Sequence, residues 1–112
     1  MNTGVDERDW KLFRRRVPAW QERWMERLDR EYLEILQSEE KASERFWALE
    51  KRIREDKKGI GVVIDMRRSQ MEWNIMRLLG QGVITLDELE GFSEELRARF
   101  EYFSHARHAD DQ

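Results

Sequence analysis

Apolar residues recur every three or four positions along most of the chain, which is the spacing that places side chains on one face of an α-helix. This pattern predicts four main helices, over about residues 18–37, 43–58, 63–79 and 86–104. Acidic and basic residues fill the positions between, so each helix needs a neighbour to cover its apolar face. The longest stripe belongs to the first of these helices and consists of Trp20, Trp24, Met25, Leu28, Tyr32, Ile35 and Leu36.

A short helix is predicted before these four, because Trp10, Phe13 and Val17 also follow helical spacing. Pro18 disfavours a helical conformation in the residue that precedes it, so we expect the short helix to end at or before Val17. A proline is tolerated in the first turn of a helix, where its missing N–H leaves no intrahelical hydrogen bond unmade. Pro18 is therefore expected to open the next helix.

Two local motifs predict helix ends. Thr85 and Glu88 have the spacing of a capping box, in which each side chain accepts a hydrogen bond from the other residue's backbone N–H. Ile84 and Leu89 flank this box at the spacing of a hydrophobic staple. Gly59 follows two lysines and is expected to end the second helix. Residues 60–64 fit either an extended segment or the entry to the third helix.

The stretch Gly82-Val83-Ile84-Thr85, followed by Asp87-Glu88-Leu89-Glu90, resembles the G-V-I-T-x-x-E hairpin of SHOCT-type C-terminal modules. This resemblance covers about residues 76–103 and implies a small pair of helices. The chain departs from those modules at residues 92–95, which are acidic here and tend to be basic there. More broadly, residues 20–103 resemble a family of short all-helical bacterial cytosolic proteins of unknown function. The resemblance implies a fold and carries over no catalytic residue.

The composition favours the same fold class. Charged residues make up 40% of the 112 positions, against about 25% in an ordinary globular domain. One proline and six glycines suit few turns, and an aromatic content of 11% is too high for a disordered acidic chain. We therefore expect one all-α domain over residues 1–112, a small bundle of about four helices with frayed ends at about 1–7 and 106–112.

The net charge and the absence of cysteine and of long apolar runs argue against several classes of function. The 21 basic and 24 acidic residues nearly cancel, which leaves a formal net charge of −3 and no global basic field for nucleic acid. No cysteine is present, so the sequence holds no disulfide framework and no thiol nucleophile. No apolar run approaches the roughly 20 residues of a transmembrane helix, and the first residues do not resemble a secretory signal. We expect a cytoplasmic protein.

The sequence shows no catalytic or cofactor motif. Gly59 and Gly61 lack the third glycine and the preceding strand of a phosphate-binding loop. His105 and His108, with Glu101, are spaced to share a helical turn as metal ligands. A solvated tail is the favoured interpretation of these three residues. We therefore expect a non-enzymatic protein with no cofactor, no metal and no small-molecule substrate.

Binding of a protein, either a second copy or another chain, is the favoured functional hypothesis. Four long amphipathic helices carry more apolar face than a small bundle buries alone. The aromatic stripe is most simply core, and a ligand-lined cavity is the less favoured alternative. Arginines 14–16 would steer an acidic partner toward the apolar anchors. The candidate partner-binding residues are Trp20, Trp24, Leu28, Tyr32, Arg14, Arg15 and Arg16.

The alternative hypothesis is a small nucleic-acid-binding regulator. It depends on basic clusters at residues 11–16, 51–58 and 67–68 meeting in space to neutralise phosphates. Acidic residues are interspersed among these clusters, so solvated and ion-paired helix faces are the simpler interpretation. The candidate nucleic-acid contacts are Lys57, Lys58, Arg67 and Arg68.

Overall fold

The computed structural model describes residues 6–110, with side chains described as far as Tyr102. This part of the chain is all-helical and contains no strand, which confirms the predicted fold class. Two short 3₁₀ helices, η1 (Arg68–Gln70) and η2 (Leu86–Leu89), punctuate the second half. The main helices are α1 (Glu7–Leu36), α2 (Ala42–Asp56), α3 (Met71–Gly80) and α4 (Glu94–Asp110).

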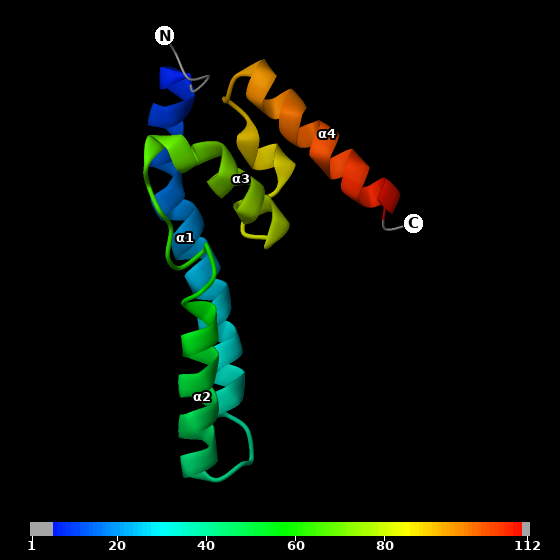
Figure 1. The fold of residues 1–112 in the computed structure, drawn as a ribbon. Coiled ribbons are helices and arrows are strands. Elements are labelled where there is room, and N and C mark those ends of the chain that lie inside the picture. Colours follow the sequence, from blue (N-terminus) through cyan, green and yellow to red (C-terminus); the bar gives the residue numbers. More distant parts are fainter. Residues whose placement is uncertain (1–5, 111–112) are drawn as a thin grey trace.

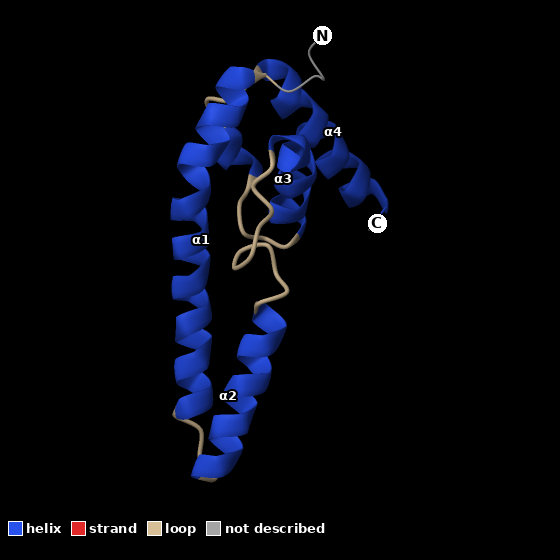
Figure 2. Ribbon diagram, turned by 60° about the vertical axis from the view of Figure 1, so that its left-hand side comes forward, coloured by secondary structure: helices blue, strands red, loops and turns tan. Residues whose placement is uncertain are grey.

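The helices form an elongated molecule of 58 × 34 × 19 Å, with a head and an arm (Figure 1). α1 runs almost the whole length and belongs to both parts. Its C-terminal half pairs with the antiparallel α2 alone, and this hairpin of residues 25–58 is the arm (Figure 2). Its N-terminal half packs with α3, η2 and α4, which together with α1 make up the head, residues 6–24 and 59–110.

The hydrophobic core lies entirely in the head. α1 supplies one stripe to it, and α3, the 83–92 segment and α4 close over that stripe. The segment 59–62, which links the arm to α3, also enters the core through Ile60. The side chains that are least exposed are Phe13, Ile60, Met71, Ile75, Leu78, Leu89 and Leu96.

α1 is one continuous helix of 30 residues, so the predicted break at Val17 is wrong. The stripe of Phe13, Val17 and Trp20 continues without change across the proline, and all three side chains are buried. Pro18 itself lies on the exposed side of the helix. Packing of that stripe in the core therefore holds the helix together across a residue that locally disfavours it.

Replacing Pro18 with alanine should raise the free energy of unfolding by about 1–3 kcal/mol, because a proline inside a helix removes one backbone hydrogen bond and crowds the carbonyl four residues earlier. The exposed ring contributes little packing that the substitution could lose. Urea unfolding of the two proteins measures the difference. A lower stability for Pro18→Ala would contradict this description of α1.

The third and fourth predicted helices begin later than the spacing indicated. The predicted helix 63–79 starts only at Met71, after the short η1, and residues 63–67 are irregular, with Arg67 in an extended conformation. Residues 59–62 form turns, which settles the segment that the sequence left open. Gln21 Nε2 donates hydrogen bonds to the Ile60 and Val62 carbonyls at 3.4 Å each, and the Ile60 N–H donates to Gln81 Oε1 at 3.1 Å. These hydrogen bonds hold residues 59–62 in place.

The predicted helix 86–104 is two elements, because η2 ends at Leu89 and α4 starts at Glu94. Gly91 separates them with a φ of +94°, a backbone conformation that favours glycine. The capping box is confirmed, and the Thr85 N–H donates to Glu88 Oε2 at 2.9 Å. Of the frayed ends expected at 1–7 and 106–112, residues 1–5 and 111–112 lie outside the described residues, whereas Glu7 is helical and α4 reaches Asp110.

Candidate interaction surface

α2 is the least covered main helix whose side chains are all described, and it has no buried residue along its 15 positions. Phe46 and Trp47 near its start are each 63% exposed, although they are among the largest apolar side chains of the chain. Their rings meet edge to face with centroids 5.0 Å apart. Two exposed aromatic rings that order each other at the end of a helix form a rigid apolar surface, of the kind that proteins use as binding anchors.

Exposed apolar side chains of α1 and α2 share one face of the arm. Asp29 on α1 and Ile53 on α2 both line a hollow at the base of the arm, and we infer from this that the two positions mark one side of the hairpin. Leu33 and Leu36 follow Asp29 by four and seven residues, and Phe46 precedes Ile53 by seven. Positions three, four or seven apart lie on one helix face. We call the exposed set Leu33, Leu36, Phe46 and Ile53 the arm face.

One ion pair of the arm joins α1 to α2, and others lie within α2. Arg52 contacts Glu31 of α1 at 3.2 Å and Asp56 of its own helix at 3.1 Å. Arg54 pairs with Glu50 at 2.7 Å along the exposed surface of α2. These pairs balance part of the charge of the hairpin locally.

The hollow at the base of the arm has a volume of about 120 Å³. Tyr32 reaches across it and donates a hydrogen bond to Asp56 Oδ2 at 2.6 Å, which joins the two helices. Burial, together with this hydrogen bond, raises the pKa of Tyr32 to about 12. The lining consists of Met25, Leu28, Asp29, Tyr32, Ile53, Asp56, Lys57 and Val62.

The raised pKa of Tyr32 predicts a pH dependence of stability. The free phenol ionises near pH 10 and the folded one near 12, so its contribution to stability is present below pH 10 and lost as the pH rises through 12. As the pH rises from 10 to 12, we expect the free energy of unfolding to fall less for Tyr32→Phe than for the wild-type protein. Urea unfolding below pH 10 and at pH 12 makes the comparison, and equal losses in the two proteins would contradict the assignment.

Two of the four apolar anchors expected from the sequence are buried in the structure. Trp20 is 5% exposed and Leu28 is 4% exposed, so neither side chain is available to a partner. Trp24 is partly buried against Gly61 and carries the Arg27 guanidinium on its ring. Tyr32 is half-buried and bound to Asp56. The exposed apolar positions of the arm replace this stripe as the candidate surface.

The three arginines expected to steer a partner have different surroundings. Arg16 donates to the Glu88 carbonyl at 2.9 Å and lies over the Phe92 ring, so it joins α1 to η2. Arg14 lies over the ring of Trp10. Arg15 is exposed. Arg16 is thus part of the head's structure, and the other two lie on its surface.

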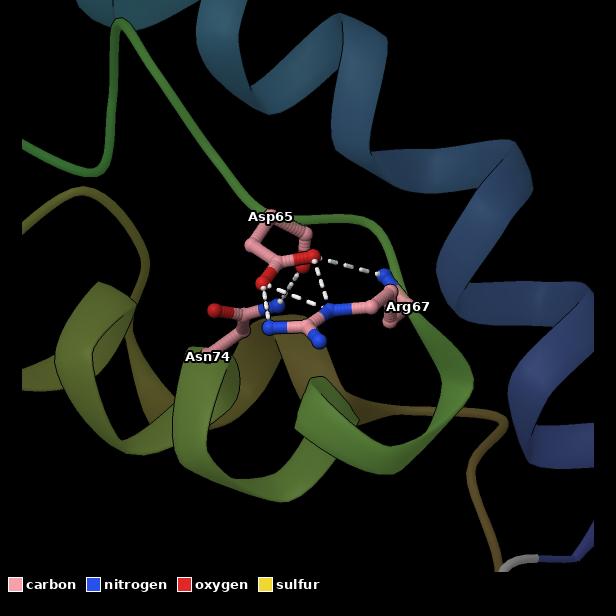
Figure 3. A network of polar contacts seen from close by, with 3 residues as sticks. All are labelled: Asp65, Arg67 and Asn74. Atoms are coloured by element: carbon pink, nitrogen blue, oxygen red, sulfur yellow. Dashed lines mark hydrogen bonds and ion pairs between the residues drawn. The ribbon is translucent and has the colours of Figure 1, made fainter.

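The residues proposed for nucleic-acid contact have acidic neighbours. Arg67 Nε donates to Asp65 Oδ2 at 2.9 Å, and this guanidinium holds the pKa of the Asp65 carboxyl below its usual range (Figure 3). The Asp65 carbonyl also accepts from Asn74 Nδ2 at 2.7 Å, which attaches the segment to α3. Arg68 pairs with Glu7 at 2.8 Å and Lys58 with Glu55 at 3.4 Å, whereas Lys57 lines the hollow. Three of the four cations are therefore balanced locally.

No group of three or more possible metal ligands occurs among the described residues, and the side chains of His105 and His108 lie outside them. Within the same part of the chain, no helix has the length and apolar character needed to span a bilayer. No family model matches the chain, and comparisons with curated proteins and with solved structures gave no significant match. A hypothesis of function therefore depends on the geometry of this chain.

Proposed function

We propose that the protein is a non-enzymatic interaction module and that another protein binds to the arm face. The observation that carries the proposal is the exposure of Phe46 on the arm face and of Trp47 beside it, on a helix with no buried residue. Hot spots of protein interfaces are enriched in tryptophan and other large side chains that become fully covered on binding. The proposal places this module in the cytoplasm, in keeping with a chain free of cysteine.

The energetics of apolar burial support this assignment. Covering one large apolar side chain contributes about 1.5–3 kcal/mol. Leu33, Leu36 and Phe46 of the arm face are at least 44% exposed, and Trp47 beside them is 63% exposed, so a partner that covers this end of the arm removes a substantial apolar area from water. Ile53 extends the same surface toward the hollow. A single exposed leucine needs no explanation, but several on one side of a narrow hairpin are typical of a binding surface.

Site-specific photo-cross-linking tests the proposal. A photoreactive amino acid at position 47 reports contacts of the arm, and the same residue at position 73 serves as the control. Trp73 is also an exposed tryptophan, at 55%, but it lies on α3 in the head. We expect ultraviolet light to give protein adducts from position 47 in cells, and Phe46→Asp to abolish them. Equal adducts from both positions, or none from position 47, would contradict the proposal.

A further inference from the structure

We propose that the occupant of the arm face is a second copy of this chain, whose arm packs antiparallel on the first to form a four-helix bundle. This inference rests on the proposed function and names its partner. The supporting observations are the polarity of charge along the arm, the self-matching register of α2, and the hollow beside Ile53.

The charge of the arm changes sign along its length. The tip half, residues 33–50, holds five acids against two bases, Lys41 and Arg45. The half next to the head, residues 25–32 and 51–58, holds seven bases against five acids. Parallel pairing of two arms would place acidic tip against acidic tip. Antiparallel pairing places the acidic tip of each arm beside the basic end of the other arm, next to the head. This arrangement is electrostatically complementary.

The tip itself shows the effect of its crowded acids. A hydrogen bond between the Glu40 and Glu44 carboxyl groups raises the pKa of Glu40. In the antiparallel arrangement, Lys57 and Lys58 of the second copy lie at the level of this pair. Cations at that position would favour the ionised form of both carboxylates.

The apolar positions of α2 match themselves in this arrangement. When two identical hairpins pack face to face and antiparallel about a twofold axis, each helix lies over its own copy. An axis passing between Leu49 and Glu50 places Phe46 of one copy over Ile53 of the other, and Ala42 over Lys57. All four positions lie on one helix face, at steps of four, seven and four residues. This register brings the two large apolar side chains of the stripe together and places Lys57 beside the acidic tip.

The hollow at the base of the arm fits the same register. Ile53 is part of its lining, together with Met25, Leu28 and Val62. Phe46 of the second copy, placed over Ile53, has its ring at the mouth of this hollow of about 120 Å³. The symmetry repeats the contact, so two phenylalanine rings fill two hollows. Complementary knobs and hollows of this kind hold helices together in bundles.

The size of the arm sets the strength of the dimer. A helix of 15 residues is about 22 Å long, and two packed helices are about 20 Å wide. The resulting face is on the order of 450 Å² per copy, below the roughly 800 Å² of a standard stable interface. We therefore expect a reversible dimer with a dissociation constant of micromolar order, which weakens at high salt.

Sedimentation equilibrium of the purified full chain tests the dimer. The wild-type protein should pass from monomer to dimer as its concentration rises through the micromolar range. Phe46→Asp should raise the dissociation constant at least tenfold, because it places a carboxylate at the mouth of the hollow. The matched control Trp73→Asp changes an exposed aromatic residue of the head and should leave the constant within twofold. Since both side chains are mostly exposed, circular dichroism should show both variants folded.

Cysteine cross-linking tests the orientation, and the chain suits it because it has no cysteine of its own. Ala42→Cys marks the tip and Lys57→Cys marks the base, each in a separate protein. After mixing and oxidation, the antiparallel bundle should give the mixed disulfide between the two variants. A disulfide-linked Ala42→Cys homodimer as the main product would overturn the proposal, since it needs two tips side by side.

The outcomes separate this inference from the proposed function. A chain that stays monomeric to millimolar concentration, or a dimer that Trp73→Asp weakens as much as Phe46→Asp, overturns self-association through the arm. If position 47 then still cross-links to a different protein in cells, the interaction function stands with another partner. If it cross-links to nothing, both proposals fail.

Discussion

Gly61→Ala should destabilise the protein by about 3 kcal/mol, the upper range for overpacking of a well-packed site. A Cβ at position 61 would lie 2.2 Å from Trp24 Cδ1 and 2.6 Å from its Cγ, far inside van der Waals contact. Gly61 is buried, and its backbone passes directly over the indole ring. Gln21 and Gln81 also form hydrogen bonds with the neighbouring Ile60, so the backbone of Gly61 cannot easily move away from Trp24.

Thermal unfolding measures this effect, which should appear as a fall of about 10–15 °C in Tm. Gly59→Ala is the matched control, because the nearest atom to its added Cβ is the Asp56 carbonyl oxygen at 3.3 Å. We expect that control to cost less than about 1 kcal/mol. In a double-mutant cycle with Trp24→Ala, the cost of Gly61→Ala should largely disappear. Equal costs with and without the indole would show that Trp24 is not the obstacle.

Asp9→Ala should cost about 2–3 kcal/mol, because Asp9 is a buried carboxylate that anchors the start of α4. It is 4% exposed, and its two oxygens accept from the Ser93 N–H at 2.8 Å and the Ser93 hydroxyl at 2.7 Å. Ser93 Oγ in turn accepts from the Leu96 N–H at 3.3 Å, which caps α4. Loss of the carboxylate leaves a partly buried N–H unpaired and frees the serine that orders the helix start.

Asp6→Ala is the control for this prediction. Asp6 caps α1 by accepting from the Arg8 N–H at 2.7 Å, but it is exposed and holds no second helix. A lost cap of this kind costs about 1 kcal/mol. Urea unfolding compares the two variants, and hydrogen exchange should show faster opening of α4 in Asp9→Ala alone. If both substitutions cost the same, Asp9 does not anchor α4.

Local features of the fold could be predicted from the sequence, because they depend on residues a few positions apart. The capping box of Thr85 and Glu88 is a property of four consecutive residues, and the structure confirms it. The continuous α1 could not be predicted, because burial of Phe13, Val17 and Trp20 by distant segments decides the conformation at Pro18. The late start of α3 could not be predicted either, because the Asp65 carbonyl accepts a hydrogen bond from the Asn74 side chain, a contact that helical spacing does not indicate.

The candidate surface shows where periodicity stops being informative. Helical spacing indicates that Trp20 and Leu28 share a face, and equally that Phe46 and Ile53 do, but it does not indicate which face finds a covering element. In the structure Trp20 joins the core that α3 and the 83–92 segment close, and Leu28 is buried at the base of the arm, whereas Phe46 and Ile53 remain exposed. One feature of the sequence indicates that the second face stays uncovered, which is its small number of apolar residues. Residues 42–56 include four apolar residues larger than alanine.

Amide hydrogen exchange across protein concentration tests the central claim, that the arm is a surface completed by a second copy, most directly. An uncovered α2 of 15 residues has little tertiary packing to stabilise it, so its amides should exchange rapidly in the monomer. We expect protection of α2 to rise with concentration through the micromolar range, while that of α3 in the head stays constant. Protection of α2 that does not change with concentration, or that rises equally in α3, would contradict the claim.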